Sequence, residues 1–183
     1  MGGQREVVFA GFGGQGVMTA GQLLAYTAME EGKQVCWIPS YGPEMRGGTA
    51  NCTVVISDER IGSPIINMPL AACVFNRPSL DKFGAMIRKD GLLLINSSLI
   101  DIKSERSDIT EFLVPANDIA RECGSPKAAN MVMLAAYVAA TGIVSFETLG
   151  IMLKEKMGKK KEFLDINFRA FEEGRKLIEK VSA

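Results

Sequence analysis

The first 32 residues combine a short β-rich run, a glycine-rich turn and a helical pattern, and this order restricts the fold more than any other feature of the chain. The run REVVFAG ends in a glycine, and GFGGQG begins at that glycine. Val17, Leu24 and Ala28 then recur at helical spacing until Gly32 stops the helix. KQVCWIP follows as a second strand, so the segment predicts a right-handed βαβ unit with parallel strands.

The alternation of strands and helices continues to the end of the chain. Further strands are expected at ANCTVVIS, AACVF, GLLLINS and EFLVPA, and the turn DERIGSP is expected to close a short hairpin. Helices are expected at RPSLDKFGAMIRKDG, at NDIARECG with Asn117 or Asp118 as its cap, at SPKAANMVMLAAYVAATG and at SFETLGIMLKEK with Ser145 as its cap. A last helical segment is expected over KKKEFLDINFRAFEEGRKLIEKV, where Leu164, Phe168, Phe171 and Ile178 share one face.

This order of elements predicts one α/β domain over residues 1–183. We expect a three-layer α/β/α architecture with a mostly parallel sheet, one antiparallel hairpin and a helical C-terminal third.

The composition excludes several classes of active site. The chain has no histidine, which excludes Ser-His-Asp and Cys-His triads and imidazole metal sites. Its 21 basic and 21 acidic residues balance, so the charge gives no reason to expect a nucleic-acid surface. Four cysteines, at positions 36, 52, 73 and 123, fit no zinc or iron–sulfur spacing. We therefore expect no catalytic residue and no metal ligand in this chain.

Two further expectations concern the cysteines and the location of the protein. Cys36, Cys52 and Cys73 lie in apolar stretches and are expected to be buried thiols in a reducing compartment, whereas Cys123 is the least clearly buried. The N-terminal MGGQREVV has no apolar signal-peptide core, and the longest run of low polarity, residues 131–146, is too short to span a bilayer. These patterns predict a cytoplasmic protein without membrane contact.

The turn GFGGQG matches the pattern G-x-G-x-x-G through Gly11, Gly13 and Gly16. Gly11 allows the tight turn, Gly13 and Gly14 let a phosphate approach the backbone, and the start of the helix offers unpaired N–H groups. A dinucleotide fold also needs an acidic residue about 20 positions later, and residues 37–40 contain none. Three interpretations of the turn therefore stay open: binding of NAD, binding of another anion or nucleotide, and close packing of the backbone against a neighbour. Gln15 either donates its amide to a ligand or partner, or faces solvent.

A second loop, SYGPEMRGG, carries unusually little charge for a surface segment. Its glycines permit positive φ, and the only charged residues between positions 6 and 58 are Glu30, Glu31, Lys33, Glu44 and Arg46. Such a loop is typical of a buried interface with a protein or a ligand.

We expect this interface to consist of Tyr41, Gly42, Glu44, Arg46 and Gly47. Arg46 would meet a carboxylate or phosphate, Glu44 would orient it and Tyr41 would anchor a partner. The alternative is a surface ion pair worth about 0–1 kcal/mol. Asn51, Asn76 and Asn96 lie near strand ends, where turn formation and helix capping are the favoured interpretation.

GFGGQG followed by SYGPEMRGG resembles the gamma subunit of 2-oxoacid:ferredoxin oxidoreductases, and the resemblance extends to NRPSLDKF, GLLLINSS, VPANDIA, SPKAANMVMLAAY and NFRAFEEG. It implies that partner alpha and beta subunits, with or without a delta subunit, hold thiamine diphosphate, Mg²⁺ and iron–sulfur clusters. The complex would convert a 2-oxoacid, coenzyme A and oxidised ferredoxin to acyl-CoA, CO₂ and reduced ferredoxin.

The same resemblance implies that this chain holds no cofactor and is inactive alone, with coenzyme A as a co-substrate of the complex. Residues 11–16 and 41–48 would line the face toward the partner chains, near coenzyme A. Among 2-oxoacids, 2-oxoglutarate is favoured, with pyruvate or a branched-chain 2-oxoacid as alternatives. The competing hypothesis is a stand-alone nucleotide-binding α/β protein that uses the GFGGQG turn.

Overall fold

The computed structural model of the protein describes residues 3–43, 47–157 and 161–182. The strands are β1 Arg5–Phe12, β2 Gln34–Tyr41, β3 Thr49–Ser57, β4 Ala71–Val74, β5 Leu92–Asn96 and β6 Thr110–Val114. The helices are α1 Val17–Glu30, α2 Arg77–Ser79 with the π-helical turn η1 Leu80–Gly84, α3 Ala116–Glu122, the 3₁₀ turn η2 Pro126–Ala128, α4 Ala129–Thr141, α5 Phe146–Met157 and α6 Lys161–Ser182.

The six strands form one sheet in the order β2-β3-β1-β4-β5-β6. The strands β1, β4, β5 and β6 pair in parallel, and β3 runs antiparallel to both of its neighbours, β1 and β2. The prediction of a mostly parallel sheet with one antiparallel hairpin is therefore confirmed. The strands β1 and β2 are parallel to each other, as expected of a βαβ unit, but β3 is inserted between them.

The hairpin lies at a different turn from the expected one. It joins β2 to β3 through residues 42–48, where the Gly42 N–H donates to the Thr49 carbonyl at 2.7 Å. The turn at DERIGSP instead opens a long loop, residues 58–70, that passes from β3 to β4 on the far side of β1. The glycine and proline of that segment resemble a hairpin signal. However, β4 is a fully buried strand whose side chains need cover on both faces, and it therefore lies inside the sheet between β1 and β5, not next to β3.

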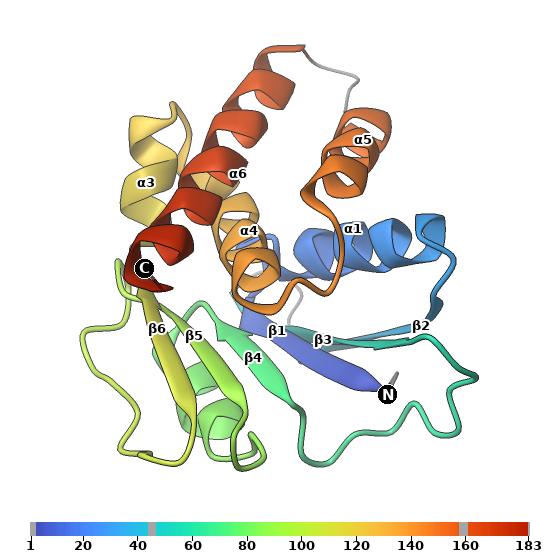
Figure 1. The fold of residues 1–183 in the computed structure, drawn as a ribbon. Coiled ribbons are helices and arrows are strands. Elements are labelled where there is room, and N and C mark those ends of the chain that lie inside the picture. The colour runs from blue at the N-terminus through green and yellow to red at the C-terminus, as the bar shows by residue number, and fades with distance from the viewer. Residues whose placement is uncertain (1–2, 44–46, 158–160, 183) are drawn as a thin grey trace.

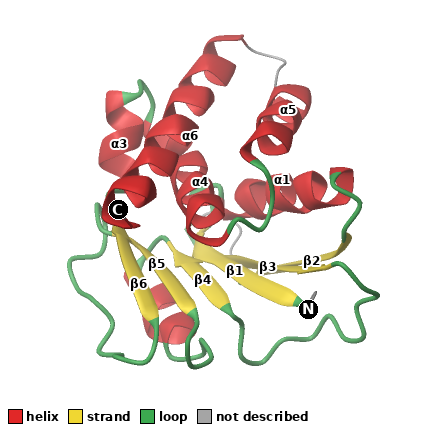
Figure 2. Cartoon of the chain, in the orientation of Figure 1, coloured by secondary structure: helices red, strands yellow, loops and turns green. Residues whose placement is uncertain are grey.

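Helices cover the two faces of the sheet unequally (Figure 1, Figure 2). The helices α1, α3, α4, α5 and α6 lie on one face, and the short α2–η1 segment lies on the other. The predicted three layers are present, and the third layer is thin because the expected helix from residue 77 to residue 91 ends at Gly84. Asn76 caps its first turn by accepting the Ser79 N–H at 2.9 Å, as the sequence favoured.

The C-terminal helix packs tightly on the body of the protein. Phe171 and Ile178 on α6 are buried in the main core, and Leu164 and Phe168 pack against its rim, so the predicted apolar face is confirmed. At Gly174 the two helices α4 and α6 approach so closely that a Cβ atom would overlap the Val132 carbonyl oxygen. Only glycine permits this approach.

Two local predictions are wrong in ways that the geometry explains. The helix α3 begins at Ala116, one residue before Asn117 and two before Asp118, and no side chain caps it; Asn117 and Asp118 make tertiary hydrogen bonds instead. Cys123 is buried, and Cys36 is only half-buried because it lies on the edge strand β2. Cys52 and Cys73 are buried as predicted, and all four cysteines are free thiols. None of the described helices is long and apolar enough to cross a membrane.

Candidate functional site

The two loops that the sequence singled out lie together at one edge of the sheet. We call this the carboxyl edge, because β1, β4, β5 and β6 all end there. The Gly13 N–H donates to the Gly48 carbonyl at 2.9 Å, and the register of β1 and β3 brings Phe12 opposite Thr49. This main-chain hydrogen bond holds the glycine turn against the 42–48 loop.

The predicted interface residues take different places in this arrangement. Tyr41 is the last residue of β2, and half of its side chain is exposed. Gly42 closes the hairpin, and Gly47 has a φ of 74°, in the left-handed region that glycine tolerates. Glu44 and Arg46 lie outside the described residues, so their proposed role stays a prediction.

The glycine turn itself depends on small residues. Gly14 and Gly16 have φ values of 102° and 78°. At Gly11 a Cβ atom would lie 2.6 Å from the Gln15 Oε1 atom and 3.0 Å from the Phe75 Cβ atom. The turn is therefore compact, with its backbone close to the end of β4.

Gln15 holds the turn in place through its side-chain amide. Its Oε1 atom accepts the Phe12 N–H at 2.6 Å and the Asn76 Nδ2 group at 3.4 Å, and its Nε2 group donates to the Phe75 carbonyl at 3.2 Å. The side chain thus bridges the ends of two adjacent strands, β1 and β4. Because these contacts occupy the amide within the chain, Gln15 acts first as a positioning residue of the glycine turn.

Two helix N-termini without side-chain caps meet beside this turn. The helix α1 begins after Gly16 and α4 begins after Ala128, and neither start has a side-chain cap or an acidic residue in its first turn. Asn130 on α4 donates to the Gly16 carbonyl at 3.2 Å, which ties the two helices together. The start of α1 offers free N–H groups and the partial positive charge of a helix N-terminus, which favour an anion. The turn η2 runs directly into α4, where the Ser125 side chain accepts the Lys127 N–H and the Pro126 carbonyl accepts the Ala129 N–H, so α4 contributes mainly its dipole.

A small cavity of about 170 Å³ opens at this point. Gly14 and Gln15 line it from the glycine turn, Asn117 from α3, and Lys127 from the start of η2. The Lys127 side chain is exposed and adds a full positive charge to the two helix starts. The carboxylate that follows Asn117 in the chain, Asp118, is bonded to Ser98 and Arg121 instead, and the Ser98 hydroxyl and the Arg121 guanidinium lower its pKa.

The asparagines near the strand ends divide into structural and site-facing residues. Asn76 caps α2, and Asn51 lies inside β3, paired with Ala10 and Ser40. Asn96, buried at the end of β5, donates through Nδ2 to the Asn117 Oδ1 atom at 2.8 Å and so fixes a side chain that lines the cavity.

Sequence reasoning missed Asn117 and Lys127, which line this cavity, and Asn130, which ties α4 to the glycine turn beside it. One signal was available, because SPKAAN places a lysine two residues before the start of α4, whose first turn has no acid. A basic residue there opposes the helix dipole unless an anion offsets it. Chemically, the arrangement offers backbone N–H groups and an ammonium group in a cavity the size of a phosphate-bearing fragment, and it suits binding of an anion.

Comparison with known proteins supports the reading of the motifs. Residues 6–177 match the family model described as pyruvate ferredoxin/flavodoxin oxidoreductase. The chain is 41% identical over 171 residues to the ketoisovalerate oxidoreductase subunit VorA of Methanothermobacter marburgensis, a match that covers 92% of this chain and 35% of that protein. The chain thus spans about a third of the length of that relative.

Two other proteins match over nearly their whole length. The 2-oxoglutarate synthase subunit KorC of Methanocaldococcus jannaschii is 34% identical over 174 residues, which covers 93% of this chain and 92% of that protein. Among solved structures, the gamma subunit of a keto/oxoacid ferredoxin oxidoreductase from Geobacter sulfurreducens superposes with a TM-score of 0.83 at 31% identity, covering 98% of this chain and 99% of that chain.

Proposed function

Because the chain belongs to the pyruvate ferredoxin/flavodoxin oxidoreductase family, we propose that it is the gamma subunit of a 2-oxoacid:ferredoxin oxidoreductase complex. In this proposal, partner alpha and beta subunits, with or without a delta subunit, hold the thiamine diphosphate, Mg²⁺ and iron–sulfur clusters. The complex transfers the acyl group of a 2-oxoacid to coenzyme A, releases CO₂ and reduces ferredoxin. We place it in the cytoplasm, where free thiols such as the four in this chain persist.

The role that we assign to this chain is to bind a phosphate of coenzyme A at the carboxyl edge. The observation that carries this assignment is the meeting of the α1 and α4 N-termini with Lys127 at one cavity. Coenzyme A carries several phosphate groups, and an ammonium group with helix N–H groups is a suitable set of partners for them. Gln15 would keep the backbone of the turn in position for that contact.

Among the 2-oxoacids we propose 2-oxoglutarate as the substrate. Support comes from a relative of similar length that is named for 2-oxoglutarate and is 34% identical, slightly more than a relative of similar length named for pyruvate at 33%. The more identical relative named for ketoisovalerate is a much longer chain. Activity of the complex with 2-oxoglutarate, ketoisovalerate and pyruvate, compared through kcat/KM, tests this choice. A kcat/KM highest for ketoisovalerate would overturn it.

Lys127→Glu tests the coenzyme A role in the reconstituted complex. Charge reversal beside a bound phosphate is expected to raise the KM for coenzyme A about tenfold or more, which corresponds to ~1.4 kcal/mol, with little change in kcat. Lys154→Glu is the matched control, because Lys154 is an exposed lysine on α5, away from the carboxyl edge. An unchanged KM in the Lys127 variant would contradict the assignment.

The competing hypothesis of a stand-alone nucleotide-binding protein makes a different prediction. It requires the isolated chain to bind NAD, FAD or ATP in calorimetry, in a manner that Lys127→Glu abolishes. Binding of that kind, together with no effect of the chain on the partner subunits, would favour it over the proposed complex.

A further inference from the structure

The side chain of Asn96 carries a buried hydrogen-bond acceptor without a partner, close to the carboxyl edge. Asn96 is the last residue of β5 and is 0% exposed. Its Nδ2 group donates to the Asn117 Oδ1 atom at 2.8 Å, whereas its own Oδ1 atom is buried and accepts no hydrogen bond from a described residue. A buried polar atom without a partner destabilises the folded state, so the presence of this asparagine calls for a reason other than stability.

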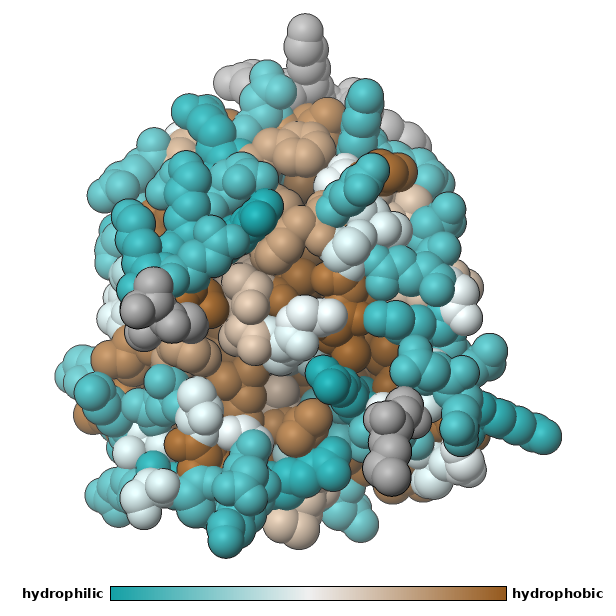
Figure 3. All heavy atoms as spheres, viewed as in Figure 1, coloured by the Kyte–Doolittle hydropathy of each residue, from teal (hydrophilic) through white to brown (hydrophobic). Residues whose placement is uncertain are grey.

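Apolar side chains surround this amide. Leu93, Leu94 and Ile95, which precede it in β5, are fully buried, and the alternation of a strand places Asn96 on the helix-covered face with Leu94. On the face of the molecule shown in Figure 3, apolar residues gather between the helices and the strands, with hydrophilic residues around them. A leucine at position 96 would leave no unpaired oxygen in such surroundings. The feature that leucine could not supply is the hydrogen bond to Asn117.

This hydrogen bond decides which group of the Asn117 amide is left for a ligand. An asparagine amide has one oxygen that accepts and one NH₂ group that donates. The Asn117 oxygen is occupied by Asn96, and the Asn117 side chain lines the cavity of about 170 Å³ beside the glycine turn. Its Nδ2 group donates to no described residue, so Asn117 offers this cavity a donor and not an acceptor.

The other side-chain acceptor at this cavity is occupied as well. The Gln15 Oε1 atom accepts the Phe12 N–H and the Asn76 Nδ2 group. The Phe75 carbonyl, which also lines the cavity, accepts the Gln15 Nε2 group. No carboxylate is among the described residues that line the cavity, and Lys127 adds an ammonium group. The cavity therefore suits a ligand group that accepts hydrogen bonds and donates none.

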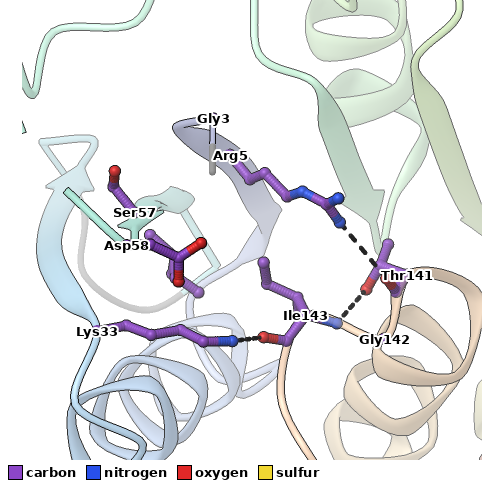
Figure 4. Close-up of a pocket in the computed structure, with 9 residues that line it drawn as sticks. Gly3, Arg5, Lys33, Ser57, Asp58, Thr141, Gly142 and Ile143 are labelled. Atoms are coloured by element: carbon purple, nitrogen blue, oxygen red, sulfur yellow. Dashed lines mark hydrogen bonds between the residues drawn. The ribbon is translucent and has the colours of Figure 1, made fainter. Parts of the chain in front are cut away.

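A cavity of about 230 Å³ at the opposite end of the sheet shows the contrast (Figure 4). Arg5 and Lys33 line it, but so does the carboxylate of Asp58. Lys33 also donates to the Ile143 carbonyl and lies 3.4 Å from the Glu31 carboxylate, so its charge is largely offset. That cavity combines donors with an acid, and the set of donors at the carboxyl edge is therefore a particular feature of that edge.

We propose that Asn117 is a specificity-determining residue that donates through Nδ2 to a phosphate group of coenzyme A, and that Asn96 is the positioning residue that holds the Asn117 amide in this orientation. The inference rests on the proposed function, because it takes the ligand from it. A phosphate group without a proton has only acceptors, so it matches the donors of Asn117 and Lys127. The ribose phosphate and the diphosphate of coenzyme A share this chemistry.

The test measures kcat and the KM for coenzyme A in the reconstituted complex at saturating subunit concentration. Asn117→Leu removes the donor and is expected to raise this KM about tenfold. Asn96→Asp keeps the size of the side chain but only accepts, so it binds the Asn117 Nδ2 group and turns the Asn117 oxygen toward the ligand; the expected rise is again about tenfold or more. In both variants kcat is expected to stay within about twofold of the wild type, because the contact is to a part of coenzyme A that does not react.

Asn167→Leu is the matched control, because Asn167 is a buried asparagine on α6 that does not line the cavity. It is expected to leave the KM for coenzyme A unchanged. Asn96→Leu serves where a buried carboxylate prevents assembly of the complex. It frees the Asn117 amide to rotate, and the cost of ordering that side chain again is expected to raise the KM about threefold.

A double variant separates positioning from a direct effect of the new charge. If Asn96 acts through Asn117, then Asn96→Asp changes the KM by less than about twofold when Asn117 is already leucine. An equal rise in both backgrounds, or a wild-type KM in Asn96→Asp, would overturn the positioning role. A wild-type KM in Asn117→Leu beside a raised KM in Lys127→Glu would overturn the whole inference and leave the proposed function intact.

Dephospho-coenzyme A, which lacks the ribose phosphate, identifies the phosphate that Asn117 contacts. If the site binds the ribose phosphate, Asn117→Leu raises the KM for coenzyme A but not for this analogue. If the site binds the diphosphate, the rise of about tenfold is the same for both compounds. A rise in the KM for the 2-oxoacid, with none for coenzyme A, would assign the two asparagines to another site and overturn the inference.

Discussion

Gln15→Met isolates the hydrogen bonds that hold the glycine turn. Methionine keeps the length and flexibility of glutamine but cannot replace the contacts with the Phe12 N–H at 2.6 Å and the Phe75 carbonyl at 3.2 Å. Each lost hydrogen bond costs about 1 kcal/mol, and a backbone donor left without a partner adds ~1–3 kcal/mol. We therefore expect the free energy of unfolding to fall by about 2–4 kcal/mol, a large part of the ~5–15 kcal/mol of a typical domain.

Urea denaturation followed by far-ultraviolet circular dichroism measures this loss, and a fall in Tm of roughly 4–16 °C should accompany it. Gln22→Met is the matched control: Gln22 is an exposed glutamine on α1, and its substitution is expected to change stability by less than about 0.5 kcal/mol. If the two variants unfold at the same urea concentration, the bridging role of Gln15 is refuted.

Three further predictions concern packing, thiol reactivity and acid stability. Gly174→Ala should cost about 1–3 kcal/mol because its methyl group overlaps the Val132 carbonyl, whereas Gly150→Ala, which meets only ordinary contacts, should gain up to about 1 kcal/mol; urea melts that move in the same direction would contradict this. Burial raises the pKa of Cys52 to about 11, so its thiol should resist Ellman's reagent at pH 8 until urea is added, and prompt labelling would show that it is not buried. Burial tends to raise the pKa of Glu31, but hydrogen bonds from Ser145 and the nearby Lys33 outweigh it and hold the pKa below 4.5. Because the folded-state pKa is lowered, this stabilisation is present above pH 4.5 and is lost as the pH falls through the folded value, so Glu31→Gln should flatten the acid limb of a stability–pH curve; an unchanged limb would exclude it.

The strands were predictable from the sequence because most of them are short apolar runs bounded by glycine, proline or polar residues. GLLLINS and AACVF are examples, and each lies within one or two residues of the observed strand. Their pairing was not predictable to the same degree. The insertion of β3 between β1 and β2 depends on tertiary register, which no local pattern specifies.

The candidate site was predictable only in part, for a related reason. The glycine turn and the 42–48 loop were visible as local motifs, but their contact through Gly13 and Gly48 follows from the pairing of β1 with β3. Lys127 comes to the cavity only because α4 packs against the start of α1. The internal use of the Gln15 amide was equally hidden, since it depends on Phe75, which is 60 residues away in the chain.

The division of labour between this chain and its partners is tested by ferredoxin reduction with 2-oxoacid and coenzyme A, measured with this chain alone, with the partner subunits alone and with both together. We predict no turnover by the chain alone and full, coenzyme A-dependent turnover only when it is combined with the partner subunits. Turnover at an enzyme-like rate by the isolated chain, or equal turnover by the partner subunits without it, would contradict this account.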